Sequence, residues 1–308
     1  MAKGSIKSVE LTGLLNWEVA PRIVAAVLDP SGEPAAHTIL FDFSGVTSVQ
    51  PDGLVTLCTV VGRLRARGGY VEFRADDSSS RAMRYLRDAG FFALYGAEDR
   101  FPTGDLRKTT FPIALAGHTQ RFDLLDNGLL PWLASRANAG AEPLADLKGQ
   151  LLEIFNNIHD HSGEKTGCFF AQHYPHWGGA DSPQGLGAIH VGASDFGIGI
   201  PASVRGVRPD LPSDIDCLVL ACQDGFSART TPRNRGAGLA HLVRNVVDRY
   251  IGEMVLVSGR AWLRFRHADV GHRVRTGALE APFPGTLIRL VIPTQALAAS
   301  GDDGDMEW

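Results

Sequence analysis

Leu151-Leu-Glu-Ile-Phe-Asn-Asn-Ile-His-Asp-His161 is the stretch that decides the fold of the C-terminal part of this chain. Its periodicity predicts a helix over 144–159 that packs through one apolar face, made of Leu147, Leu151, Ile154, Phe155 and Ile158. Glu153 and Asn157 are four residues apart, so they share one side of that helix, beside the apolar face. A carboxylate one turn from an amide can activate a nucleophile and give Mg2+ an oxygen ligand.

Two glycine motifs follow this helix. Ile189-His-Val-Gly-Ala-Ser-Asp195 is an apolar strand that ends in a carboxylate, and Phe196-Gly-Ile-Gly-Ile-Pro201 comes directly after it. A carboxylate at a strand end can accept a hydrogen bond from the exocyclic amine of adenine, and glycines let the backbone approach a base and sugar closely. The second motif, Arg235-Gly-Ala-Gly-Leu239, opens another helix, whose first N–H groups and dipole favour an anion.

In this order the three motifs resemble the N, G1 and G2 boxes of the GHKL superfamily of ATPases and kinases. That superfamily includes the ATPase component of DNA gyrase, MutL, sensor histidine kinases and the anti-sigma-factor serine kinases. The run Pro284-Gly-Thr-Leu-Ile-Arg-Leu-Val-Ile-Pro293 is similar to its last box. The resemblance spans roughly residues 110–295 and implies a Bergerat-type α/β sandwich, with a mixed sheet covered by helices.

The resemblance also implies a role for each matched residue. Glu153 would be catalytic, orienting and deprotonating the attacking water or hydroxyl, and Asn157 would hold the Mg2+ that bridges the phosphates of ATP. Asp195 would recognise adenine. Residues 200–235 would form a lid that carries Arg229, Arg233 and Arg235. The other ATP-binding positions would be Gly197, Gly199, Gly236, Gly238, Leu239 and Thr286.

The first hundred residues alternate strands and helices, which predicts a parallel-type α/β layer. The expected strands are 38–43 and 70–74, and the expected helices are 52–67 and 80–88. With Phe41-Asp-Phe-Ser-Gly-Val-Thr-Ser48 and the following Asp52-Gly53-Leu54, this order resembles a STAS domain, the fold of anti-sigma-factor antagonists, over roughly residues 5–98.

Asp52 stands where STAS antagonists carry a phosphorylatable serine. An aspartate can imitate the modified serine with part of its charge. The simpler interpretation is that Asp52 is the N-cap of the helix that begins there.

The chain is therefore expected to be an α/β protein in four parts. These are a STAS-like domain at 1–100, a connector with a first strand at 101–142, the GHKL-like domain at 143–296 and an acidic, disordered tail at 297–308. Two strands, 254–258 and 262–266, are expected to pair as a hairpin in the third part.

Composition excludes several classes of protein. An apolar share of 44% and a charged share of 21% in 308 residues fit a globular protein with a full core. A net charge of −4 without a long basic run disfavours strong nonspecific nucleic-acid binding. The sequence shows neither a signal peptide nor an apolar run that could cross a membrane, and its four cysteines form no CxxC pair, which predicts a cytoplasmic protein.

Three functions are compatible with these motifs. The first is an ATP-hydrolysing regulatory switch coupled to the STAS-like domain. The second is an anti-sigma-type protein serine/threonine kinase, and the third is a noncatalytic module whose protein-binding surface depends on nucleotide. All three imply ATP and Mg2+ as ligands and partners of the STAS or sigma-regulator type, and they leave a homodimer open.

Overall fold

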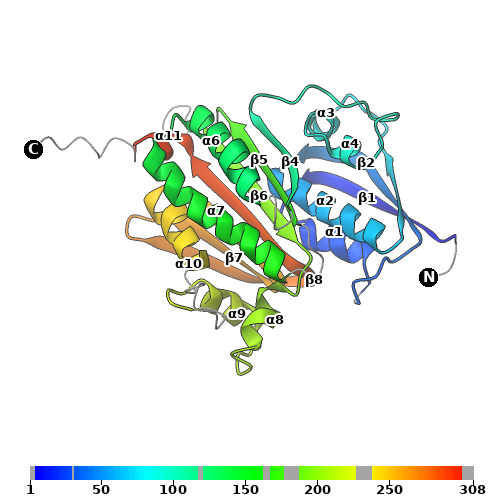
Figure 1. The fold of residues 1–308 in the computed structure, drawn as a ribbon. Helices are drawn as coiled ribbons and strands as arrows, with labels where there is room; N and C mark the ends of the chain where they lie inside the picture. Colours follow the sequence, from blue (N-terminus) through cyan, green and yellow to red (C-terminus); the bar gives the residue numbers. More distant parts are fainter. Residues whose placement is uncertain are drawn as a thin grey trace, which may run out of the picture.

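The computed structural model describes residues 4–29, 31–116, 121–161, 167–176, 187–226 and 238–299, without the side chains of 116, 121, 141, 142, 153, 155–161 and 299. Two sheets form its framework (Figure 1). The first has three parallel strands in the order β1-β2-β3. The second has five strands in the order β4-β5-β6-β8-β7. The strands are β1 (Ile6–Leu15), β2 (Thr38–Val49), β3 (Tyr70–Arg74), β4 (Thr110–Ala116), β5 (Gly167–Tyr174), β6 (Ala188–Asp195), β7 (Glu253–His267) and β8 (His272–Pro293).

Helices lie on both sides of the second sheet (Figure 1). Those of the N-terminal part are α1 (Ala20–Val27), α2 (Pro51–Ala66), α3 (Arg81–Asp88) and α4 (Phe91–Leu94). Those of the remaining chain, including two π-helical segments, are α5 (Arg121–Asp123), η1 (Leu124–Leu129), α6 (Leu130–Ala137), α7 (Ala141–His161), α8 (Gly199–Arg205), α9 (Asp214–Ala221), α10 (Gly238–Val243), η2 (Arg244–Arg249) and α11 (Thr294–Ala299).

The α/β class expected from the sequence is confirmed, and several elements begin and end close to where they were expected. The strand at 70–74 is confirmed as β3. Helix α3 begins after Ser80, whose hydroxyl accepts a hydrogen bond from the N–H of Met83 at 3.2 Å, so Ser80 is the N-cap. Strand β1 and helix α1, which the sequence did not predict, complete the N-terminal layer.

Residues 254–258 and 262–266 both lie within β7 and pair with β8 on either side of an irregularity at Ser258–Ala261, where Gly259 has a φ of +60°. The chain folds back at this irregularity, because Arg264 donates to Glu253 Oε2 at 2.8 Å, whereas a straight strand would separate these two residues by about 36 Å. One expectation about the second sheet is wrong. The described strand pairs of this sheet are all antiparallel rather than mixed, and for β7 and β8 the short turn at 268–271 requires it.

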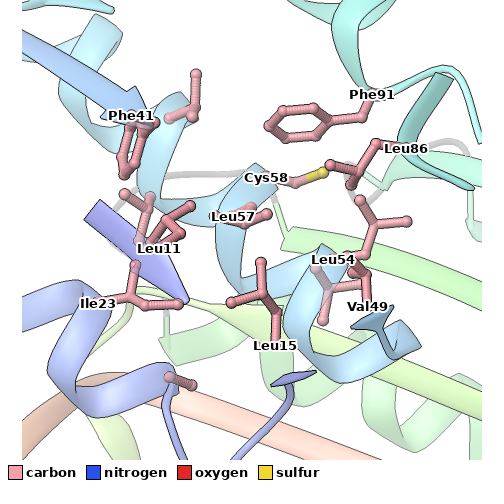
Figure 2. Close-up of a cluster of buried hydrophobic side chains, with 14 of the residues drawn as sticks. Leu11, Leu15, Ile23, Phe41, Val49, Leu54, Leu57, Cys58, Leu86 and Phe91 are labelled. Carbon is pink, nitrogen blue, oxygen red and sulfur yellow. The ribbon is translucent and has the colours of Figure 1, made fainter. Parts of the chain in front are cut away.

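One apolar core joins the N-terminal layer to the second sheet. Helix α2 lies between the two sheets (Figure 1) and contributes Leu54, Leu57 and Cys58. Figure 2 shows these three side chains beside residues of the first layer such as Leu15 and Phe91. The same cluster contains residues of the second sheet, namely Phe170, Val255, Val257 and Leu287. The N-terminal layer therefore covers one face of the five-stranded sheet.

The opposite face of this sheet carries a second core. Leu147, Leu151 and Ile154 of α7 are buried there, as the helical periodicity predicts. They share this cluster with Val191 of β6 and Leu290 of β8. Helix α7 is thereby fixed against the sheet by its apolar stripe, which orients the rest of its surface.

Candidate functional site

Asp195, the last residue of β6, is a buried carboxyl group at a strand end. It is 1% exposed, and its Oδ1 accepts a hydrogen bond from the N–H of Gly197 at 2.7 Å. Burial raises the pKa of Asp195 from its ordinary value of 3.8 to about 7, although backbone hydrogen bonds from Gly197 and Thr286 act in the opposite direction. Near neutral pH this carboxyl group therefore exchanges between a neutral and an ionised form, and either form can hydrogen-bond a polar ligand.

Strand β8 lies directly beside this carboxyl group. Thr286 is the antiparallel partner of Asp195, and Gly285 precedes it with a φ of +75°. A Cβ atom on Gly285 would lie 2.3 Å from the carbonyl oxygen of Asp195 and 2.7 Å from the N–H nitrogen of Gly197. The backbone at the end of β6 and the backbone of β8 thus approach each other at a distance that only glycine allows.

A buried serine joins this strand end to helix α8. The N–H of Ile200 donates to Ser258 Oγ at 2.9 Å, and Ser258 Oγ–H donates to the carbonyl oxygen of Gly285 at 2.5 Å. Gly199, the first residue of α8, has a φ of +76°, and a Cβ there would meet Ser258 Oγ at 2.9 Å. Ser258 and Gly285 were not predicted as positioning residues from the sequence. Ser258 stands in no motif, and Gly285 was quoted only as part of the run 284–293.

The structure brings together four of the residues that the sequence singled out. Asp195, Gly197, Gly199 and Thr286 meet where β6 ends beside the middle part of β8. Glu153 and Asn157 belong to α7, which packs against β5 and β6, but their side chains lie outside the described residues.

Helix α10 carries two of the expected phosphate-binding residues. It begins at Gly238 and contacts α7, and Leu239 packs against the core beneath both helices. Gly236 lies outside the described residues, as do Arg229, Arg233 and Arg235 of the expected lid. The described part of that lid folds into α8 and α9.

Metal ligation and membrane insertion can be judged only for the described residues. Across that part of the chain, no three side chains of His, Cys, Asp or Glu are grouped to hold a metal ion. The side chain of Asn157, the expected Mg2+ ligand, is not among those described. None of the helices traced there has the length and apolar character that crossing a bilayer requires.

Asp52 is not the N-cap of its helix, so the simpler interpretation of this residue is wrong. The N-cap is Gln50, and Asp52 is the second residue of α2. Its side chain is 0% exposed and points toward the second sheet, because Pro51 fixes the first turn of the helix against Gly192 of β6. A Cβ atom on Gly192 would lie 2.6 Å from the carbonyl oxygen of Pro51, so this close approach depends on glycine.

The carboxylate of Asp52 takes part in a buried ionic chain between the two sheets. Its Oδ2 accepts from the N–H of Trp17 at 2.5 Å, and its Oδ1 lies 3.6 Å from Arg289 Nε. Arg289 on β8 also pairs with Glu253 on β7, which in turn accepts from Arg264 and Arg266. Burial raises the pKa of Asp52, and the charge of Arg289 opposes that rise.

The raised pKa of Asp195 predicts a pH-dependent stability. The native carboxyl group keeps its proton up to pH of about 7, whereas the unfolded one loses it near 3.8, so this group lowers stability as pH rises between these values. A difference of about 3 pH units corresponds to at most about 4 kcal/mol. Asp195→Asn should therefore gain stability over the wild type at pH 8 but not at pH 4, in urea unfolding at both values.

Asp210→Asn is the matched control, because Asp210 is exposed and pairs with Arg208 on the surface. It should change stability little at either pH. If Asp195→Asn and the wild type have equal unfolding midpoints at pH 8, ionisation of the buried carboxyl group does not destabilise the native state.

Comparison with known proteins gives no family for this chain. No protein-family model matches it, and no curated protein is similar to it. Among solved structures, "Crystal Structure Analysis of Mglu" is 21% identical over 27% of this chain, with a TM-score of 0.21. This chain spans only 19% of the length of that protein, and a likeness of this size carries no argument about fold or function.

Proposed function

We propose that this protein binds Mg-ATP in the region bounded by α7, the start of α10 and the end of β6, and that it acts as a nucleotide-dependent regulatory switch coupled to its STAS-like N-terminal layer. ATP hydrolysis is the proposed reaction. Glu153 would position and deprotonate the attacking water, and Asn157 would hold Mg2+, which neutralises charge on the phosphates. Gly236, Gly238 and Leu239 would cradle the phosphates at the start of α10.

The observation that supports this proposal best is the environment of Asp195. A carboxyl group buried at a strand end is costly unless it meets a polar partner. Here the group accepts a hydrogen bond from the N–H of Gly197, the backbone of Gly285 lies directly against it, and Thr286 is its partner on β8. The amino group of adenine is a partner of the right size and polarity for such a position.

The coupling to the N-terminal layer rests on the shared core and on the pair Asp52–Arg289. Arg289 lies on β8, three residues from Thr286, so the strand that borders the proposed adenine position also holds the buried carboxylate of α2. STAS antagonists carry a phosphorylatable serine at this position, whereas the carboxylate of Asp52, beside Arg289, would supply a negative charge without phosphorylation. A change in β8 on nucleotide binding would then reach α2 directly.

The test is calorimetric titration of ATP with Mg2+ into the purified chain at pH 8. We expect binding by the wild type and by Asp210→Asn, and a loss of affinity of at least about 100-fold in Asp195→Asn, whose amide NH2 group would oppose the adenine amine. If the wild type binds no adenine nucleotide, or if Asp195→Asn binds as well as wild type, the proposal is wrong.

A second measurement separates hydrolysis from the alternatives. Glu153→Ala should bind ATP with wild-type affinity and lose at least about 100-fold in phosphate release, because a general base contributes about 10²–10⁴ in rate. Full turnover in that variant would remove Glu153 from the mechanism. Transfer of labelled phosphate to a STAS partner would instead indicate a serine/threonine kinase, and binding without turnover a noncatalytic module.

A further inference from the structure

The hairpin formed by the end of β7 and the start of β8 carries four arginines on one face. In the register of these strands Arg264 lies opposite Arg275, and Arg266 lies opposite Arg273. Since residues two apart on a strand share a face, all four guanidinium groups are on the same side of the ribbon. His267 and His272 form the next pair toward the turn.

Like charges directly across a strand pair destabilise it, and here two such pairs are consecutive. Glu253 offsets part of this repulsion by accepting hydrogen bonds from Arg264 and Arg266. That contact also fixes the direction of these two guanidinium groups. Arg273 and Arg275 are exposed, and no carboxylate of the described residues pairs with either of them.

A hollow of about 330 Å³ lies over this face. Its lining contains the four arginines and His267 against a single carboxylate, Asp269, with Ala268 as the remaining residue. Around such a hollow a positive potential is concentrated, although the whole chain has a net charge of −4. Guanidinium groups match the oxygens of phosphate in bidentate geometry better than any other cation of proteins does.

We infer that this arginine face is a second anion site, separate from the proposed ATP site, that binds a compact phosphate-bearing molecule such as a pyrophosphate or a phosphomonoester. Arg264 and Arg266 are held in place by Glu253, and Arg273 and Arg275 are free to close on the anion. The confinement of the positive charge to one hairpin favours a small ligand over an extended nucleic acid, which needs a longer basic surface.

The inference is tested by titrating inorganic pyrophosphate into the full chain at low ionic strength, with EDTA present so that no divalent metal contributes. The Arg273→Gln/Arg275→Gln variant should lose at least about 10-fold in affinity. Its control is Arg22→Gln/Arg84→Gln, which makes the same change of charge at exposed arginines of α1 and α3. The control should bind as the wild type does.

Two further measurements keep the outcome unambiguous. The Arg273→Gln/Arg275→Gln variant should unfold at the same urea concentration as wild type or a higher one, because it loses two repulsive pairs. Pyrophosphate should bind equally well when Asp195→Asn is present, since the two sites are separate.

Equal pyrophosphate affinity in the wild type and the Arg273→Gln/Arg275→Gln variant would overturn the inference. Tighter binding of a single-stranded RNA of about 20 nucleotides than of pyrophosphate, lost in that variant, would also overturn it and indicate a nucleic-acid surface.

Discussion

Replacing Arg289 with methionine is expected to destabilise the protein by about 3–5 kcal/mol at pH 8, the usual cost of removing one partner from a buried ion pair. Arg289 is 6% exposed, and its nearest buried anion, Asp52, is 0% exposed. Without the guanidinium, only backbone N–H groups, those of Trp17 and of Asp52 itself, remain as partners for the charge of Asp52. Glu253 is less affected, because Arg264 and Arg266 still donate to it.

The loss in Arg289→Met should be smaller at pH 5 than at pH 8. Burial raises the pKa of Asp52, and removal of Arg289 raises it further, so at low pH the native carboxyl group takes up a proton and becomes neutral. A native pKa above the unfolded value means that stability falls as pH rises between the two. Urea unfolding of wild type and variant at both pH values measures this difference.

The double variant Asp52→Asn/Arg289→Met completes a thermodynamic cycle. With neither charge buried, it should regain most of the stability lost in Arg289→Met, and the asparagine can still accept from Trp17. Two outcomes would contradict an ionic contact between α2 and β8. One is an equal loss of stability in Arg289→Met at pH 5 and pH 8. The other is a double variant whose loss of stability equals the sum of the losses in the two single variants.

Gly285→Ala is expected to cost about 2–5 kcal/mol and to abolish ATP binding. Two effects add here. An alanine at φ +75° costs about 1–2 kcal/mol in backbone conformation alone. Its Cβ atom would also lie 2.3 Å from the carbonyl oxygen of Asp195 and 2.7 Å from its Oδ1, and such overpacking adds about 1–3 kcal/mol. The clash pushes β8 away from the carboxyl group that the nucleotide is proposed to meet.

Gly271→Ala separates these two effects. Gly271, in the turn between β7 and β8, has a φ of +63°, and a Cβ there meets no atom within 4 Å. It therefore has only the conformational cost, about 1–2 kcal/mol, and should leave ATP affinity unchanged. Unfolding and ATP titration of both variants are the measurements. If Gly285→Ala is no less stable than Gly271→Ala, the close contact between Gly285 and Asp195 is not rigid.

Some elements were predictable because their signals are local. The strand at 70–74 follows directly from β-forming residues after a glycine pair, and α3 from Ser80 as its cap. The apolar stripe of α7 predicted which residues would meet the sheet, and Leu147, Leu151 and Ile154 do so. Asp195 was found because a carboxylate that ends an apolar strand before two glycines is visible in the sequence alone.

Other features depend on residues far apart in the chain. The expected strands 254–258 and 262–266 lie on either side of the irregularity at Gly259, and only the tertiary structure shows that both pair with β8. Ser258 meets Gly285 and Ile200 through hydrogen bonds between three separate segments, and no local motif marks such a contact. The four arginines are two residues apart in two short runs, and only the register of the hairpin places them on one face.

The sequence by itself determined the α/β class, the positions of most elements and the carboxyl group at the end of β6, because these follow from periodicity, caps and glycines within short stretches. Only the tertiary structure decided the role of Asp52. In the sequence it is a helix-opening aspartate, whereas in the folded chain it is a buried anion facing Arg289, from a strand near the other end of the chain. The reason is physical: the free energy of a charge depends on its solvation and on its partners, and packing of α2 against the second sheet fixes both.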